Sequence, residues 1–279
     1  GDAEFLKKVF HMNVTQYKGT FDRGLSDTSR GLSPSLWADC PLSEIRNGYV
    51  NGIIMDDDFI SDAGITAVTT DASLVGLPYR GFNSSGGTHT HPDVAGGELA
   101  LTEATANEAN FIRSTVCPFQ ISSALGDLWF EARVKVSSIS NVGMIVGLWD
   151  NVANTVDIPL SAADPPIMAT TGNFVGFRMP EGAGLVIGSY DADDSGQTTD
   201  AEVVVNASCG TMVADTYAKL GMRFERRTGL LAWYFNGVKC ANTKAVPNAT
   251  GTDFPADVRL GLIFGQKLVA TAAGVSTID

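Results

Sequence analysis

The sequence predicts an all-β protein built as a two-sheet antiparallel β-sandwich. Two segments carry this prediction, Leu128–Val136 and Ala218–Glu225, because apolar and polar residues alternate strictly in both. A period of two gives a strand one buried and one wetted face, as in an antiparallel sheet rather than a helix. The composition agrees, since 30 glycines and 18% charged residues suit strands joined by turns.

The amino-terminal part is predicted to be an extended arm over residues 1–48. A short helix is expected at Glu4–Phe10, followed by a stretch rich in Gly, Ser, Asp and Pro. Isolated apolar residues punctuate this stretch and are the expected anchors on a partner's surface: Phe21, Leu25, Leu32, Leu36 and Trp37. The alternative is a disordered or self-packed tail.

Residues 49–279 are predicted to form the sandwich from short strands, several of them punctuated by glycine. The expected strands are Tyr49–Met55, Glu98–Thr102, Ala109–Ser114, Leu128–Val136, Gly143–Trp149, Phe174–Arg178, Leu185–Tyr190, Glu202–Asn206, Tyr217–Glu225, Leu230–Phe235 and Val258–Phe264. Residues 76–97 are expected to be a loop-rich region, and Asn236-Gly237 is a strong hairpin signal. Many short strands without a long helix predict a jelly-roll sandwich.

The charge balance excludes some partners. The net charge is −12 and the pI is about 4.6, which argues against direct contact with nucleic acid phosphates. Residues 1–48 hold six acidic and six basic residues, so the sandwich carries the whole negative charge. No apolar run approaches the length of a membrane helix, and no membrane partner is expected.

The four cysteines, Cys40, Cys117, Cys209 and Cys240, are far apart and contain no C-x-x-C spacing. This pattern predicts neither a zinc site nor a disulfide-dense scaffold. We expect four reduced, mostly buried thiols in a protein folded in a cytosol.

Two loops suggest metal ligands. In the first, Asp191, Asp193, Ser195 and Glu202 occupy positions 1, 3, 5 and 12 of an EF-hand-like calcium loop. Strands rather than helices flank this loop, so a solvated acidic hairpin loop is the alternative. In the second, His89 and His91, with Asp93, could chelate a transition metal, although a polar loop at a subunit contact is the simpler interpretation. No other cofactor is expected.

Catalytic patterns are missing from the sequence. It contains no paired carboxylates alternating on one strand, no Ser-His-Asp elbow and no phosphate-binding glycine loop, so we expect a protein that is not an enzyme. Four aromatic residues, Trp129, Trp149, Trp233 and Tyr234, could stack on sugar rings. Trp129 falls on the polar face of its predicted strand, whereas Trp233 and Tyr234 lie in an apolar hairpin, where core packing is the ordinary explanation.

Several strings, taken in order, resemble a known family. LWFEARVKV, GMIVGLWD, FVGFR, the string TYAKLGMRFERRTGLLAWYFNGV and finally DFPADVRLGLIFG are similar to the concanavalin A-like (laminin G-like) jelly-roll proteins of tailed bacteriophage virions. The resemblance covers roughly residues 96–279. It implies a structural component of the virion.

The leading expectation is a decoration or cement protein on the outer surface of the phage head, made in the host cytoplasm. Its expected partners are the major capsid protein and neighbouring copies of itself, with a trimer favoured. The arm would lie over the shell while the acidic sandwich projects outward. The alternative is a carbohydrate-binding module of a tail fibre or spike that recognises host glycans.

Overall fold

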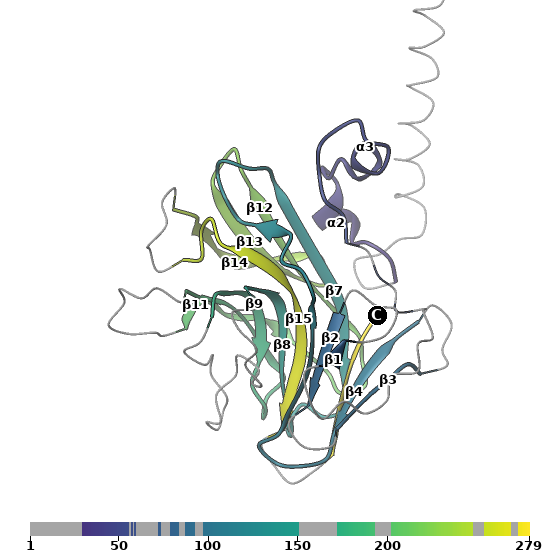
Figure 1. Ribbon diagram of the computed structural model, residues 1–279. Helices are drawn as coiled ribbons and strands as arrows, with labels where there is room; N and C mark the ends of the chain where they lie inside the picture. The colour runs from purple at the N-terminus through teal and green to yellow at the C-terminus, as the bar shows by residue number, and fades with distance from the viewer. Residues whose placement is uncertain are drawn as a thin grey trace, which may run out of the picture.

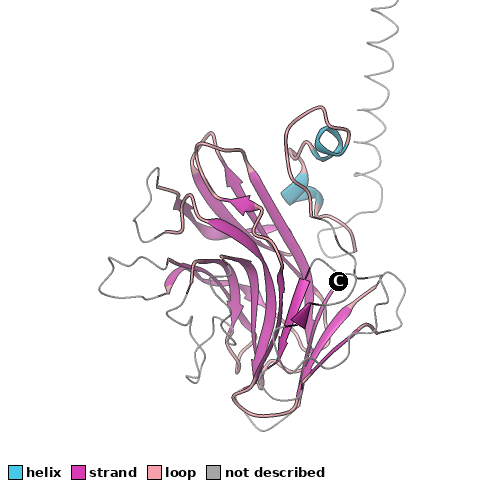
Figure 2. Cartoon of the chain, viewed as in Figure 1, coloured by secondary structure: helices cyan, strands magenta, loops and turns pink. Residues whose placement is uncertain are grey.

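The described part of the chain is a β-sandwich of two antiparallel sheets preceded by two short helices (Figures 1 and 2). The computed structural model describes residues 30–55, 57, 59, 72–73, 79–83, 87–92, 97–150, 172–192, 202–247, 254–268 and 273–279. No helix among them is both long enough and apolar enough to cross a bilayer. The predicted fold class is confirmed.

One sheet has nine strands within the described residues. Its order is β1 (Ala72–Ser73), β2 (Tyr79–Asn83), β5 (Ala109–Ser114), β15 (Arg259–Leu268), β8 (Val142–Trp149), β9 (Phe174–Met179), β10 (Leu185–Asp191) and β11 (Val203–Thr211), with β6 (Phe119–Gln120) also pairing with β15. The second sheet has seven: β14 (Val238–Ala245), β13 (Leu230–Phe235), β12 (Ala218–Glu225), β7 (Leu128–Val136), β16 (Gly274–Ile278), β4 (Leu99–Glu103) and β3 (Thr88–Thr90).

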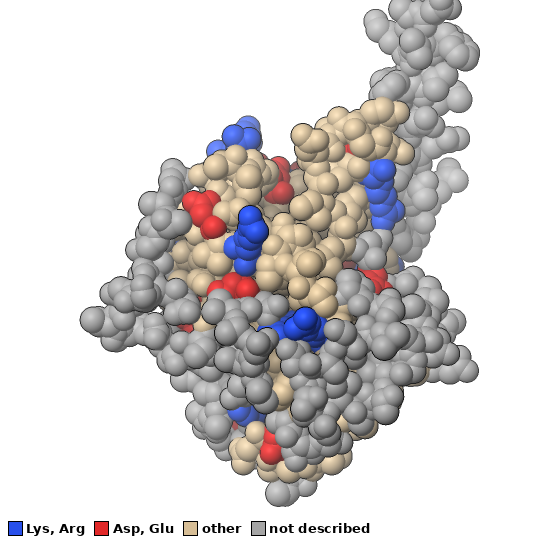
Figure 3. All heavy atoms as spheres, viewed as in Figure 1, with Lys and Arg blue, Asp and Glu red and all other residues tan. Residues whose placement is uncertain are grey.

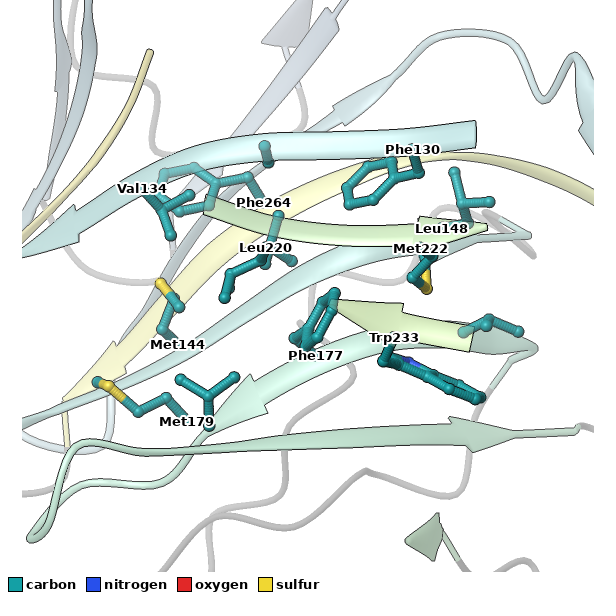
Figure 4. Packing of buried hydrophobic residues seen from close by; sticks show 14 of the residues in the cluster. Phe130, Val134, Met144, Leu148, Phe177, Met179, Leu220, Met222, Trp233 and Phe264 are labelled. Carbon is teal, nitrogen blue, oxygen red and sulfur yellow. The ribbon is translucent and has the colours of Figure 1, made fainter. Parts of the chain in front are cut away.

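The core lies between the two sheets, and the strand alternation explains its composition. Phe130 and Val134 of β7 point inward with Leu220 and Met222 of β12, and they meet Phe177 and its neighbours from the opposite sheet (Figure 4). The other core residues drawn there include Met144, Leu148, Met179, Trp233 and Phe264. Burial of such large apolar side chains is the main stabilising contribution to the fold.

Trp233 links the two sheets by a hydrogen bond. Its side chain is fully buried, and its indole Nε1 donates a hydrogen bond across the core to the Gly176 carbonyl at 2.9 Å. A buried indole needs such a partner, because an unpaired N–H in an apolar core is costly.

Two sequence predictions about strands are wrong. Tyr49–Met55 is not a strand, and its Tyr49, Val50 and Ile53 side chains are 70%, 42% and 60% exposed. The region of residues 76–97 contains β2 and β3, although it was expected to be loop. Glycine and polar residues concealed these strands, because β3 reads Thr-His-Thr and shows no apolar alternation.

The expectation of four free thiols is also wrong. Cys209 of β11 and Cys240 of β14 form a disulfide with a Cα–Cα distance of 5.1 Å, which joins the two sheets at their outer strands. Cys40 and Cys117 are free and half-buried. Burial raises the pKa of the Cys40 thiol to about 11, so this thiol stays protonated and unreactive at neutral pH.

Candidate ligand-binding cavity

A short segment crosses the outer face of the seven-stranded sheet. We call residues 30–40 the strap. It contains α2 (Pro34–Trp37), which begins with a proline and lies beside β7 and β12 (Figure 1). Leu36 is only 1% exposed and rests on Gly221, where a Cβ atom would lie 2.4 Å from the Leu36 Cδ2 atom. Gly221 therefore leaves the space that Leu36 fills.

The strap buries an ion pair on the sheet face. Glu131 of β7 and Lys219 of β12 lie 3.7 Å apart, with side chains only 6% and 2% exposed. The Ser33 amide donates to Glu131 Oε1 at 3.0 Å, and Lys219 Nζ donates to the Gly31 carbonyl. Burial raises the pKa of Glu131, while the bond from Ser33 and the charge of Lys219 oppose that shift.

Charged contacts fix the strap at each end. At its start, the Arg30 guanidinium binds Asp279, with Nε 3.0 Å from Oδ2 and Nη2 2.9 Å from Oδ1, and Arg133 also donates to this carboxylate. At its end, Asp39 lies 3.2 Å from Arg223. Each carboxylate is therefore compensated by at least one guanidinium.

A cavity of about 1500 Å³ opens beside the strap. It runs along the edge of β7, where β16 pairs with residues 134–136 alone, so residues 128–132 have a described strand neighbour on one side only. A second short helix, α3 (Leu42–Arg46), and residues 48–55 close the opposite side. The cavity thus exists because the sheet stops short at this corner.

The cavity has two walls of different chemistry. What we call the polar wall is formed by the strap and the outer face of β7: Arg30, Trp37, Asp39, Trp129, Glu131 and Arg133. What we call the apolar wall combines half-buried side chains from residues 45–55, β6 and β15: Ile45, Ile54, Met55, Phe119 and Leu262.

The polar wall combines aromatic and charged side chains. Two of its donors, Trp129 Nε1 and Arg133 Nε, are buried and have no hydrogen-bond partner among the described residues. The Arg223 guanidinium lies 5.7 Å from the centre of the Trp129 ring. On the face seen in Figure 3, basic and acidic side chains are interspersed. The polar wall itself contains both basic residues, Arg30 and Arg133, and acidic residues, Asp39 and Glu131, together with the aromatic surface of its tryptophans.

Three of the five predicted arm anchors fall within the described residues, and all three contact the chain's own sandwich. Leu36 is packed on Gly221, while Leu32 and Trp37 line the cavity. Leu36 thus packs on the chain's own sandwich, while contact of these anchors with a partner stays a prediction. Phe21 and Leu25 lie outside the described residues, as does the predicted helix at Glu4–Phe10.

The two ends of the predicted calcium loop have structural roles. Asp191 is the buried last residue of β10, and the Glu202 carboxylate oxygens lie 2.6 and 2.7 Å from Arg178 Nε. Asp193 and Ser195 lie outside the described residues. A calcium ion at this loop stays a prediction.

The two histidines of the H-x-H pair each face a backbone carbonyl. His89 is buried in β3 with Nε2 3.2 Å from the Phe111 carbonyl, and His91 Nδ1 lies 3.2 Å from the Glu98 carbonyl. Burial lowers the pKa of His89 to about 4, so its ring is neutral at physiological pH. Asp93 lies outside the described residues, and the described part of the chain shows no cluster of three metal-binding side chains.

The chain matches no protein-family model and no curated protein. Among solved structures, the potassium-bound carbohydrate recognition domain of Emp46p is 10% identical, with a TM-score of 0.46 over 72% of this chain and 87% of that one. A structure titled for endo-acting O-glycanases of the human gut microbiota is 10% identical, with a TM-score of 0.47 over 81% and 96%.

A third similar structure is the carbohydrate esterase vb_24B_21 of the Shiga toxin-encoding bacteriophage phi24B. It is 12% identical, with a TM-score of 0.41 over 77% of this chain and 97% of that one. These structural neighbours are β-sandwich domains that recognise or act on carbohydrates, as their names state. At such identities the likeness concerns the fold alone.

Proposed function

We propose that the protein is a non-enzymatic carbohydrate-binding protein whose glycan lies against the polar wall of the cavity. The observation that carries this proposal is the polar wall itself, where two half-buried tryptophans, Trp37 and Trp129, line the cavity beside charged side chains. Binding sites for small molecules are concave and aromatic, with a few placed polar groups. A sugar ring supplies both an apolar C–H face for an indole and hydroxyl groups for the charged side chains.

The state of the cavity's carboxylates supports binding rather than catalysis. Glu131 is paired with Lys219, Asp279 with Arg30 and Arg133, and Asp39 with Arg223. A general acid for glycoside cleavage needs a proton at working pH, and a nucleophile needs an unobstructed carboxylate. These three carboxylates of the cavity are instead engaged in ion pairs, so none of them is an unobstructed nucleophile.

Replacing Trp129 with alanine tests the proposal. We expect the wild-type protein to bind at least one glycan on an array, and we expect Trp129→Ala to weaken that binding at least tenfold in calorimetric titration. The loss of the stacked ring gives the physical reason. The matched control is Tyr234→Ala, because Tyr234 is a half-buried aromatic residue on the same sheet but outside the cavity.

A different outcome would end the proposal. It fails if the array yields no glycan, or if Trp129→Ala and Tyr234→Ala bind the same glycan as tightly as the wild type. Circular dichroism of each variant separates lost binding from lost folding.

Decoration of a phage head is the second candidate, and one observation favours it. The exposed Tyr49, Val50 and Ile53 side chains form an apolar segment beside the cavity, and exposed apolar clusters mark protein contacts. In this proposal the partners are the major capsid protein and further copies of the chain, in a trimer on the outer surface of the head. Hundreds of copies per purified particle would support it, and a handful at the tail would contradict it.

A further inference from the structure

We infer that the ligand of the cavity is amphipathic, namely a sugar joined to a hydrocarbon chain, as in a glycolipid. This inference rests on the proposed function for the sugar, and it adds a second binding element, the apolar wall. The sugar would lie on the polar wall, and the chain would cross the edge of β7 onto the apolar wall.

The first support is that the apolar wall is incompletely covered. Leu262 of β15 points toward the core between Leu260 and Phe264, which are both buried, yet Leu262 is only half-buried. The reason is local: β6 has two residues, and β16 pairs with β7 only from Val134 onward. Among the residues that the structure describes, the sandwich is therefore open at this corner, and Leu262 lines the cavity there.

The second support is that other apolar side chains face the same opening. Ile45, Ile54, Met55 and Phe119 are all half-buried and line the cavity together with Leu262. An apolar surface of this kind is favourable to cover with a hydrocarbon chain and costly to leave in water. The deepest lining residues, including Leu148, are almost completely buried, so the hydrocarbon chain would lie on the half-buried residues of the apolar wall rather than between the sheets.

The third support is the continuity of the two walls. Trp129 and Phe130 are adjacent on β7, and successive side chains of a strand point to opposite faces. One faces the strap and the other faces the core, and both line the same cavity. A single ligand crossing the edge of β7 would therefore contact both walls. A volume of about 1500 Å³ exceeds the range of about 300–1000 Å³ typical of small-molecule pockets, so it has room for both parts.

Three neutral probes test the inference by calorimetry below their micelle concentrations. Methyl β-glucoside carries a sugar alone, octyl tetraethylene glycol carries a chain alone, and octyl β-glucoside carries both. We expect saturable one-to-one binding of both octyl compounds to the wild type. Each methylene that becomes buried should strengthen binding about fourfold, so octyl β-glucoside should bind far more tightly than the methyl compound.

Two variants test where the hydrocarbon chain of the probe binds. Leu262→Gln and Ile54→Gln are expected to weaken binding of both octyl compounds at least tenfold, because each places an amide in the path of the chain. Ile54 lies outside the regular strands, so its variant remains informative if Leu262→Gln fails to fold. The matched control is Val258→Gln, since Val258 is a half-buried residue packed on the core but absent from the cavity wall.

The outcomes separate this inference from the proposed function. The inference is overturned if neither octyl compound binds, which is the result expected if the polypeptide itself fills the cavity. It is also overturned if the variants at Leu262 and Ile54 bind both octyl compounds as tightly as the wild type does. If octyl compounds bind through Leu262 while the array yields no glycan, the apolar site stands and the carbohydrate proposal falls. If glycans bind through Trp129 but the length of the hydrocarbon chain has no effect on affinity, the carbohydrate proposal stands and the apolar site falls.

Discussion

Replacing Lys219 with methionine is expected to lower the free energy of unfolding by about 3–5 kcal/mol. The variant keeps the length of the side chain but leaves Glu131 buried under the strap without its cation. An uncompensated buried charge costs far more than a lost surface pair. Urea unfolding followed by tryptophan fluorescence measures the difference.

Two control variants make this result specific. The double variant Glu131→Leu and Lys219→Met should recover most of the loss, because it removes both charges together. Arg227→Met breaks the exposed pair with Glu225 and should change stability by less than about 0.5 kcal/mol. Equal effects of Lys219→Met and Arg227→Met would mean that the strap does not bury the ion pair.

Removing the disulfide is expected to cost about 3–4 kcal/mol. Cys209 and Cys240 are 31 residues apart, and closing a loop of this length restricts the unfolded chain. The bond also joins β11 to β14, the outer strands of the two sheets. The measurement compares urea unfolding of the wild type with that of the double variant Cys209→Ala and Cys240→Ala.

The free thiols provide the control for that experiment. Cys40→Ala and Cys117→Ala should each change stability by about 1 kcal/mol or less, because neither residue is cross-linked. A double variant at Cys209 and Cys240 that unfolds at the same urea concentration as the wild type would contradict the expected role of the bond. Thiol titration of the unfolded wild type, before and after reduction, counts the cross-linked cysteines independently.

The sequence was sufficient to predict the fold class, because the main strands follow a period of two. β7, β5 and β13 have the predicted bounds, and β12 begins one residue later than Tyr217. Strands such as β1 and β6 escaped prediction, since two residues cannot display a period. Pairing of Cys209 with Cys240 escaped as well, because their separation of 31 residues follows no known spacing.

Most of the candidate site could not be predicted from the sequence. The alternation within β7 and β12 correctly placed Glu131 and Lys219 on the outer face of the sheet. It predicted that this face is exposed to solvent, whereas the strap covers it. Local pattern does not report which distant segment covers a face, and α2, with four residues, is too short for a helical period. Trp129 was identified as a candidate for sugar stacking, whereas Trp37, which lines the same polar wall, was predicted to contact another protein.

The most direct test of carbohydrate binding at the polar wall is a nuclear magnetic resonance titration of the indole N–H signals. The chain has four tryptophans, and the signal of Trp129 can be assigned from the Trp129→Phe variant. On addition of a glycan that binds, the Trp129 signal should shift because the glycan stacks on its half-buried ring. The Trp233 signal should stay unchanged, since its Nε1 is bonded to Gly176 inside the core. Binding of a glycan without any shift at Trp129 would contradict the proposed site.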